Sequence, residues 1–287
     1  MRTDLDRIVA HLCAIEDAVA ERTEPLAWGT AVFHGRVPWV REVNMVRVEA
    51  AVTRLSAGDI AFAAEERFPQ APAIEVLHEP TGAALAPAFA AAGWQVSRHL
   101  LMALERPPPD PAAATAATVA EVSPDDVWPL REEWMRSEPW GADDAVAAML
   151  RWERHRAELT GARAFCAHVD ERPVSMCLLL STPHATEVER VYTTPAHRAG
   201  GLAHAVVARA ARDAAHQLTF LFTDAHGAAQ HLYARLGFRR AWVVYRFSGA
   251  RRPADGIGTS DRAQGSLPPA LRSHPARPPE KSTAPRT

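Results

Sequence analysis

The chain has 287 residues, 47% of them hydrophobic, and a formal net charge of −2. This length is sufficient for one large domain or two ordinary ones with buried cores. The near-neutral charge excludes the basic surface that nucleic-acid binding needs, and no stretch approaches the roughly 18 continuous apolar residues of a membrane span. Three scattered cysteines predict neither a disulfide framework nor a metal cluster. We expect a soluble, cytoplasmic protein without a metal, a membrane contact or a nucleic-acid partner.

The first patterned segment is residues 1–22. Its apolar residues recur at helical spacing and predict an amphipathic helix, without the apolar block of a secretory signal; they are Leu5, Ile8, Val9, Leu12, Ile15 and Val19. Residues 31–37, AVFHGRV, predict a hairpin, and residues 44–50, NMVRVEA, predict the next strand.

Two regions have the composition of unstructured chain. Residues 106–118, RPPPDPAAATAAT, are typical of a linker. From residue 248 onward the chain is rich in Pro, Gly, Ser and Arg, which predicts a disordered tail over 248–287. The folded domains are therefore predicted over 1–105 and 119–247.

The second half has the clearer pattern of elements. Helices are predicted over 125–137, 143–159, 200–216 and 226–236, and strands over 163–169, 174–182, 186–193, 218–222 and 239–247. The strand at 218–222 is wholly apolar, as buried strands that pair in parallel are. Gly237 follows the last helix at the position where a left-handed residue ends it. The order predicts an α/β fold, in which helices cover a mixed sheet.

The two halves are related in pattern. Residues 73–94 align without a gap on 217–238, and both segments run from an apolar strand through a helix to a glycine and an aromatic residue. Only four of the aligned positions are identical, so the shared order of elements carries the argument. We expect the chain to contain two copies of one fold.

A short glycine pair marks the candidate binding loop. The segment HRAGGLAHAVV at 197–207 places Gly200 and Gly201 between Arg198 and the predicted helix. Free N–H groups and the positive dipole end at the first turn of a helix bind anions, and small residues let a phosphate approach them. The arginine adds a positive charge beside the phosphates. A close-packed turn is the alternative explanation.

This loop resembles the acyl-CoA-binding motif of the GCN5-related N-acetyltransferase (GNAT) superfamily, Gln/Arg-x-x-Gly-x-Gly/Ala. The resemblance extends to VYTTP at 191–195 and to DAHGAAQHLYARLGF at 224–238, and it covers 119–247. It implies two GNAT-like domains, of which the second binds acetyl-CoA and transfers its acetyl group to a small-molecule or peptide amine. The absence of G-x-G-x-x-G after a first βαβ strand argues against a dinucleotide fold.

The resemblance assigns roles residue by residue. The main chain of Val191, Tyr192 and Thr193 is expected to pair with the pantetheine arm, and one N–H, that of Val191, to bind the carbonyl oxygen. The pyrophosphate is expected on Arg198, Ala199, Gly200, Gly201, Leu202 and Ala203. Tyr233 matches the general acid that protonates the departing thiolate. Asp224 stands where the family often has Asn, so its cofactor contact is in doubt and it could instead cap the following helix.

An amine acceptor also has to lose a proton before it can attack. Glu187 and Glu189 lie two residues apart on one strand, so both side chains point to one face and either could be the base. His184, His197, His226 and His231 are weaker candidates. The acceptor is expected near residues 134–141, WMRSEPWG, where aromatic and acidic residues gather; covering the core is the alternative role of these tryptophans.

The first half lacks these features. Phe89 aligns with Tyr233 and has no proton to donate, and Pro80 aligns with Asp224. Asp59 stands where a phosphate would be repelled. We therefore expect a degenerate N-terminal copy that packs on the active half or shapes the acceptor site. Two other functions stay open: a non-catalytic acyl-CoA sensor or scaffold, and acetylation of a thiol-cofactor precursor, as in mycothiol synthase.

Overall fold

The computed structural model describes residues 3–52, 55–108, 117–138, 140–214, 217–225 and 227–250. The predicted linker is therefore described only at its two ends, and the predicted tail only at residues 248–250. The predictions for the rest of both segments, and for His226, lie outside the described residues.

The same order of elements occurs twice along the chain. The first half contains α1 (Asp4–Val19), β1 (Arg22–Leu26), β2 (Gly29–Phe33), β3 (Met45–Val48), α2 (Ala57–Arg67), β4 (Ala73–Val76), α3 (Glu79–Ala91) and β5 (Gln95–Leu104). The second half opens with β6 (Thr118–Val122) and α4 (Trp128–Ser137). It then repeats the order of the first half as α5 (Asp143–Thr160), β7 (Arg163–Val169), β8 (Arg172–Ser181), β9 (Thr186–Thr193), α6 (Leu202–Asp213), β10 (Thr219–Asp224), α7 (Ala229–Arg235) and β11 (Phe238–Ser248).

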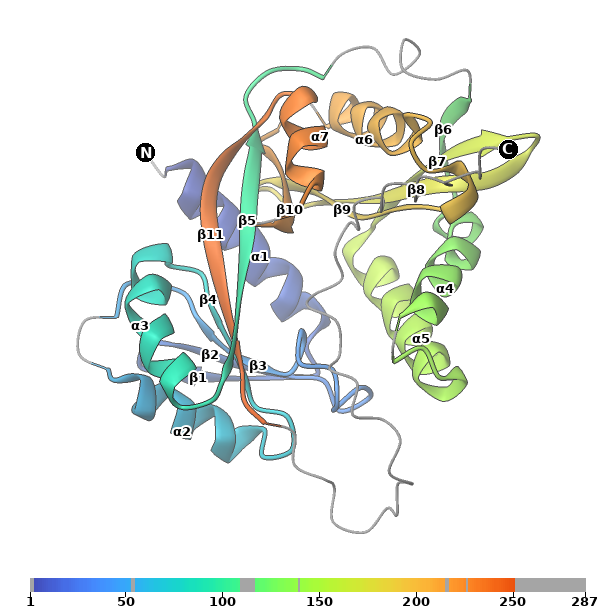
Figure 1. The fold of residues 1–287 in the computed structure, drawn as a ribbon. Coiled ribbons are helices and arrows are strands. Elements are labelled where there is room, and N and C mark those ends of the chain that lie inside the picture. Colours follow the sequence, from blue (N-terminus) through green and yellow to red (C-terminus); the bar gives the residue numbers. More distant parts are fainter. Residues whose placement is uncertain are drawn as a thin grey trace, which may run out of the picture.

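The two halves share one sheet by exchanging their last strands. The strand order is β1-β2-β3-β4-β11-β5-β10-β9-β8-β7-β6. β5 of the first half lies between β11 and β10, while β11 of the second half lies between β4 and β5. Figure 1 shows these two long strands side by side at the centre of the molecule. Each half is thus completed by a strand from the other.

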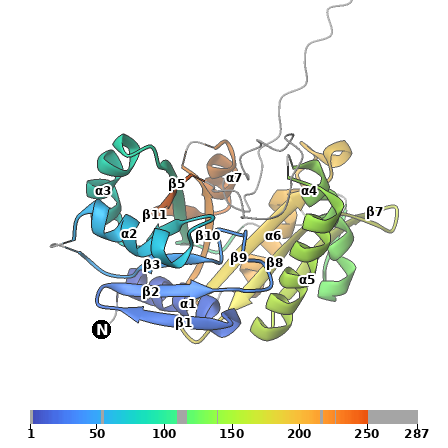
Figure 2. The ribbon, with the colours of Figure 1, turned by 90° about the horizontal axis from the view of Figure 1, so that it is seen from below.

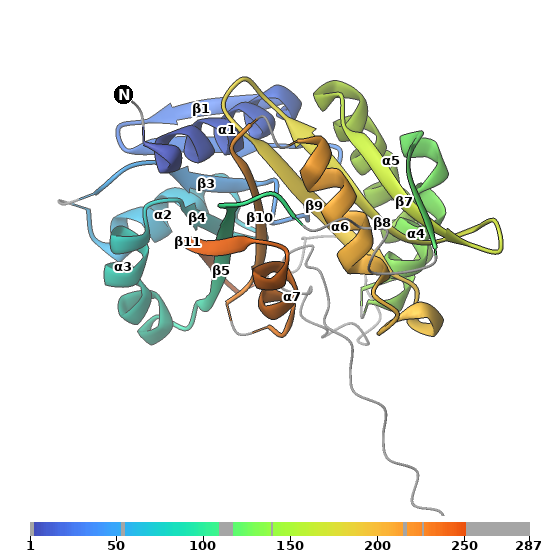
Figure 3. The ribbon, with the colours of Figure 1, turned by 90° about the horizontal axis from the view of Figure 1, so that it is seen from above.

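Helices cover both faces of this sheet. One face carries α2, α3, α6 and α7, and its core runs across both halves; Figure 3 shows α6 lying over β8 and β9, and α7 beside β11. The other face carries α1, α4 and α5. Figure 2 shows the halves side by side, with α2 and α3 in one and α4 and α5 in the other.

Alternation along the strands explains how both faces are filled. In β7, Phe165 packs toward α6 and Cys166 toward α4 and α5, as a period of two requires. Burial raises the pKa of the Cys166 thiol to about 11. The strand therefore has apolar residues on both sides, consistent with its place inside a covered sheet.

The structure confirms most predicted elements and the mixed α/β fold, with three differences. β6 and α2 were not predicted. The first hairpin joins β1 to β2 through residues 27–28, so residues 31–37 hold only the end of its second strand. β10 is parallel to β9 but antiparallel to β5, because its other neighbour comes from the first half.

Candidate functional site

A bulge in β9 opens the sheet at the predicted site. Tyr192 pairs with Met176 and Glu189 with Leu178, so Arg190 and Val191 together oppose one residue of β8. Arg190 has a φ of 56°, the left-handed conformation that such a bulge exploits. Beyond the bulge, β9 and β10 separate: the register between them contains only Thr186–Thr219 and Glu187–Phe220 among the described residues. The main chain of 191–193 therefore lies along an opening between two strands.

The loop after β9 brings open amides to the same end of the sheet. A short 3-10 turn, Pro195–His197, leads to Gly201, which is the N-cap of α6 with a φ of 77°. No side chain of the described residues caps this helix, so the N–H groups of its first turn stay available to an anion.

The two glycines serve different purposes. Gly201 has a left-handed backbone, which a side chain disfavours. A Cβ on Gly200 would meet only the carbonyl oxygen of His197 within 4 Å, at an ordinary 3.6 Å. Neither packing nor conformation within the protein requires glycine at 200. Open space for a ligand is therefore the remaining reason for a glycine at position 200.

Arg198 and Tyr192 hold the end of β9 in place. The Nε of Arg198 donates to the Thr193 carbonyl oxygen at 3.2 Å. The Tyr192 hydroxyl donates to Glu133 Oε1 on α4 at 3.0 Å, and burial together with Glu133 raises the tyrosine pKa to about 12. The side chain of Tyr192 therefore faces α4, which leaves only its main chain for the opening.

A cavity lies where the opening meets the boundary between the halves. It encloses about 1150 Å³ of empty space, counted with its mouth to solvent. The second half contributes Glu187, Glu189, Val191 and Tyr233, and the first half contributes residues of α1, β2, β3, β4 and β5. Tyr233 packs with the core on the α6 face, so the separation of β9 from β10 brings it and the two glutamates to one space.

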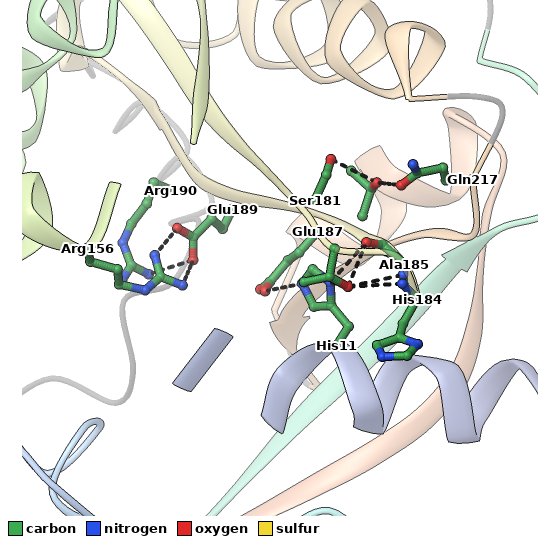
Figure 4. Close-up of polar contacts among 11 residues, drawn as sticks. His11, Arg156, Ser181, His184, Ala185, Glu187, Glu189, Arg190 and Gln217 are labelled. Carbon is green, nitrogen blue, oxygen red and sulfur yellow. Dashed lines mark hydrogen bonds and ion pairs between the residues drawn. The ribbon is translucent and has the colours of Figure 1, made fainter. Parts of the chain in front are cut away.

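Both glutamates line this cavity, as their spacing predicts, but their partners differ. Glu189 is bonded to Arg156, one contact being 3.1 Å, and lies 3.5 Å from Arg190. Burial alone raises the pKa of Glu189, but these guanidinium groups outweigh it and lower the pKa to about 2. Glu187 instead faces His11 of α1 (Figure 4). Glu189 is thus held by guanidinium groups, which leaves Glu187 as the candidate base.

The ion pairs continue beneath the bulge. Arg190 Nε lies 3.1 Å from Glu153 Oε1, and Arg131 binds the same carboxylate through two contacts of 3.0 and 2.8 Å. All three side chains are at most 9% exposed. This buried network fixes Arg190, and with it the strand geometry at Val191.

Other predicted residues lie at or beyond the edge of the cavity. Asp224 ends β10, in register with His99 of β5, and its carbonyl oxygen accepts from Gly227. Helix α7 has Ala228 as N-cap and no side-chain cap from the described residues, and the capping role of Asp224 stays a prediction. His184, His197 and His231 are not among the described residues that line the cavity.

The tryptophans of 134–141 belong to the core. Trp134 is 4% exposed and lies edge-on to Trp140 at 6.1 Å, in the cluster formed with α4 and α5. The Arg131 guanidinium stacks over the Trp134 ring at 4.4 Å. Neither tryptophan is among the cavity-lining residues described, so the geometry favours the core role for both.

The described residues of the first half form no equivalent opening. β3 and β4 remain paired to their ends, where the Leu77 N–H donates to the Val48 carbonyl oxygen at 2.9 Å. Helix α2, the counterpart of α6, is closed by a capping box between Ser56 and Asp59. Phe89 is fully buried and stacks on Phe247 at 4.2 Å. Among the described residues, this half offers neither open amides nor a proton donor at these positions.

Sequence reasoning missed the cavity residues of the first half. His11, on the buried face of α1 next to Leu12, is the most informative of them. Its signal was a lone histidine on an otherwise apolar helix face. His34 also lines the cavity, and burial lowers its pKa to about 4, so its ring is neutral near pH 7.

Comparisons with known proteins give one family match and several similar folds. Residues 127–238 match the model of the acetyltransferase (GNAT) family. A GCN5-related N-acetyltransferase from Kribbella flavida has 19% identity and a TM-score of 0.59, over 85% of this chain and 94% of that one. A functionally unknown conserved protein from Staphylococcus epidermidis has 13% identity and a TM-score of 0.61, over 81% and 95%.

A tandem GNAT protein from the clavulanic acid biosynthesis pathway has 14% identity and a TM-score of 0.51, over 85% of this chain and 89% of that one. At these identities the likeness extends to the fold. The search of curated protein sequences found no match. In the described part of the chain, no helix is long and apolar enough to cross a membrane, and no group of three or more His, Cys, Asp or Glu residues is arranged to hold a metal ion.

Proposed function

Because residues 127–238 match the model of the acetyltransferase (GNAT) family, we propose that this chain transfers the acetyl group of acetyl-CoA directly to an amine. The observation that carries the proposal is the meeting of Val191, Tyr233 and Glu187 in one cavity at the point where β9 leaves β10. An amide donor and a base from β9 and an acid from α7 reach the same space.

The residues present fit the coenzyme. The uncapped first turn of α6 and the space beside Gly200 suit a pyrophosphate. Arg198, already anchored on Thr193, adds a positive charge. The main chain of 191–193, which lies outside the register between β9 and β10 in the described residues, suits the amides of the pantetheine arm, which would add to β9 as an extra strand does.

Acetyl-CoA supplies an activated thioester, and the chain supplies proton transfer and charge stabilisation. The Val191 N–H stabilises the negative charge that develops on the carbonyl oxygen. Glu187 takes a proton from the acceptor ammonium, because only the neutral amine has the lone pair that attacks. Tyr233 gives a proton to the departing thiolate. Cys166 and Cys177 need no part in this direct transfer, and both are fully buried.

The acceptor is placed in the part of the cavity formed by the first half. Carboxylates from α1 and β4 line that part, and burial together with the charge of Glu75 raises the pKa of Glu16 to about 8 against the opposing charge of Arg47. A positively charged amine would relieve this crowding of acidic groups. The proposed role of the first half is therefore to shape the acceptor site.

The test is turnover by Tyr233→Phe with a panel of small amines and peptide N-termini. We expect acetyl-CoA binding to persist while kcat falls by about 10²-fold or more, the usual effect of removing a general acid. Tyr245→Phe is the matched control, since Tyr245 is buried on β11 outside the cavity lining, and it should retain wild-type kcat. Tight acetyl-CoA binding without turnover of any amine by the wild type would support the sensor function instead.

A further inference from the structure

His11 is a buried histidine that the first half places against the proposed base. It lies on α1, is 0% exposed, and packs edge-on against Phe220 of β10 at 5.2 Å. Its neighbours on the buried face of the helix, Ile8 and Ile15, are apolar. Burying a polar ring at this position costs free energy unless both of its nitrogens interact with polar partners.

The first nitrogen is fixed by the loop before β9. Nδ1 lies 2.9 Å from the Ala185 carbonyl oxygen and 3.0 Å from the Thr182 hydroxyl oxygen. A carbonyl oxygen can only accept, so Nδ1 carries a hydrogen and donates it. The Thr182 hydroxyl oxygen accepts from the His184 and Ala185 N–H groups at 3.2 and 3.5 Å, which holds the loop in position around the ring.

The second nitrogen then faces Glu187. Nε2 is 3.8 Å from Glu187 Oε2 and has no hydrogen-bond partner among the described residues; Figure 4 shows the two side chains directed at each other. With Nδ1 protonated, a neutral ring points a lone pair at a carboxylate that also has only lone pairs. A proton placed between them turns this unfavourable contact into a favourable one.

We propose that His11 and Glu187 form one proton-accepting unit, in which Glu187 touches the acceptor and His11 stores the proton behind it. The proposal rests on the acetyltransferase function proposed above. Glu187 lines the cavity and is 10% exposed at its side chain, whereas His11 is sealed from solvent. His11 is therefore a positioning residue that acts through the glutamate.

The proton count of the step is balanced. The acceptor ammonium gives one proton to Glu187, which shares it with Nε2 and leaves an imidazolium beside a carboxylate. The neutral amine forms the C–N bond as the C–S bond breaks. The nitrogen releases a second proton, which equals the proton that the thiolate takes through Tyr233. The proton on the unit leaves to solvent after product release, so the net products are amide, thiol and one proton.

The surroundings favour this arrangement. The side chain of His11 faces Glu187, and Arg156 of α5, whose charge also acts on Glu187, is already bound to Glu189. That ion pair spares Glu187 from a guanidinium partner, so Glu187 stays open to a proton. His11 also makes the first half a part of the catalytic site, because the ring comes from α1.

The kinetic test compares His11→Gln, Glu187→Gln and the double variant. The glutamine side chain can reach Glu187 but cannot take a proton. We expect His11→Gln to lower kcat by about 10²-fold, within the usual range for general-base catalysis, with unchanged affinity for acetyl-CoA. The double variant should lose no more than Glu187→Gln alone, since both changes disable one unit. His168→Gln, a half-buried histidine of β7, is the control and should match the wild type.

The second test reads the ring directly by ¹⁵N NMR of the wild type. We expect His11 to be protonated on Nδ1, and Glu187→Gln to move its Nε2 signal while that of His168 stays in place. Three results would each overturn the proposal: a wild-type kcat in His11→Gln, a fold loss of kcat in the double variant equal to the product of the two single losses, or a His11 Nε2 signal that Glu187→Gln leaves unchanged. If the wild type acetylates no amine, the proposed function fails, and the NMR arm still decides whether the two residues share a proton.

Discussion

At the scale of single residues, partners decide what identical side chains do. Glu187 and Glu189 are the same residue type, two positions apart, and line the same cavity. One faces a buried imidazole and the other is bound by two guanidinium groups. The sequence alone shows their shared face but not their partners, because those come from α1 and α5, far away in the chain.

The ion pair of Glu189 predicts a pH dependence of stability. A carboxyl pKa lowered from 4.5 to about 2 in the folded state corresponds to about 3 kcal/mol of stability. The sign follows from the lowered pKa: this stability is present above pH 4.5 and is lost as the pH falls from there toward 2. Urea unfolding of the wild type and Glu189→Gln from pH 7 to 2 measures it. Between pH 4.5 and 2, the free energy of unfolding should fall less steeply for Glu189→Gln than for the wild type. An equal fall in both proteins would contradict the assignment.

At the scale of elements, the loop before α6 uses its two glycines for different reasons, a left-handed backbone at 201 and open space at 200. The sequence pattern does not distinguish these reasons. The glycine pair predicts small residues near a helix start, and the structure places the helix start at Leu202, after both glycines. Of the two glycines only Gly201 has a positive φ, and Ala199 in the same loop has one of 65°. The bulge at Arg190 was beyond sequence reasoning, because its cause is a buried ion-pair network with Glu153 and Glu189 rather than a local signal.

Gly201→Ala and Gly200→Ala are therefore expected to differ in stability. A non-glycine residue in the left-handed conformation costs roughly 1–2 kcal/mol, so Gly201→Ala should lower the free energy of unfolding by about that amount. Gly200→Ala adds a methyl group at an ordinary contact distance and should leave the free energy unchanged or slightly higher. Urea titration of both variants decides the point, and equal losses would show that the loop is strained throughout.

At the scale of the whole molecule, the exchange of β5 and β11 ties the two halves together. The sequence predicted most strands and the repeat of elements, since both depend on local pattern. It could not predict that each half completes the sheet of the other, because pairing between distant strands leaves no local trace. The cavity between the halves was missed for the same reason, and the acceptor was expected at residues 134–141 instead.

The shared sheet predicts that the halves do not fold alone. A fragment of residues 119–250 lacks β5, so β10 and β11 lose their common neighbour and expose unpaired edges. We expect neither this fragment nor residues 1–108 to unfold cooperatively, whereas the two expressed together should associate and regain acetyl-CoA binding. Circular dichroism melts and size-exclusion chromatography test this. A cooperative transition in either fragment alone would mean that the exchanged strand is dispensable.

The most direct test of the account is calorimetric titration of acetyl-CoA into the wild type and into Gly200→Asp. The claim is that open amides at the start of α6 bind the pyrophosphate, with space left by Gly200. We predict saturable heat with the wild type, and loss of binding in the variant at an unchanged melting temperature, because the added carboxylate repels phosphate without disturbing the fold. The absence of heat from the wild type, or equal affinity in the variant, would contradict it.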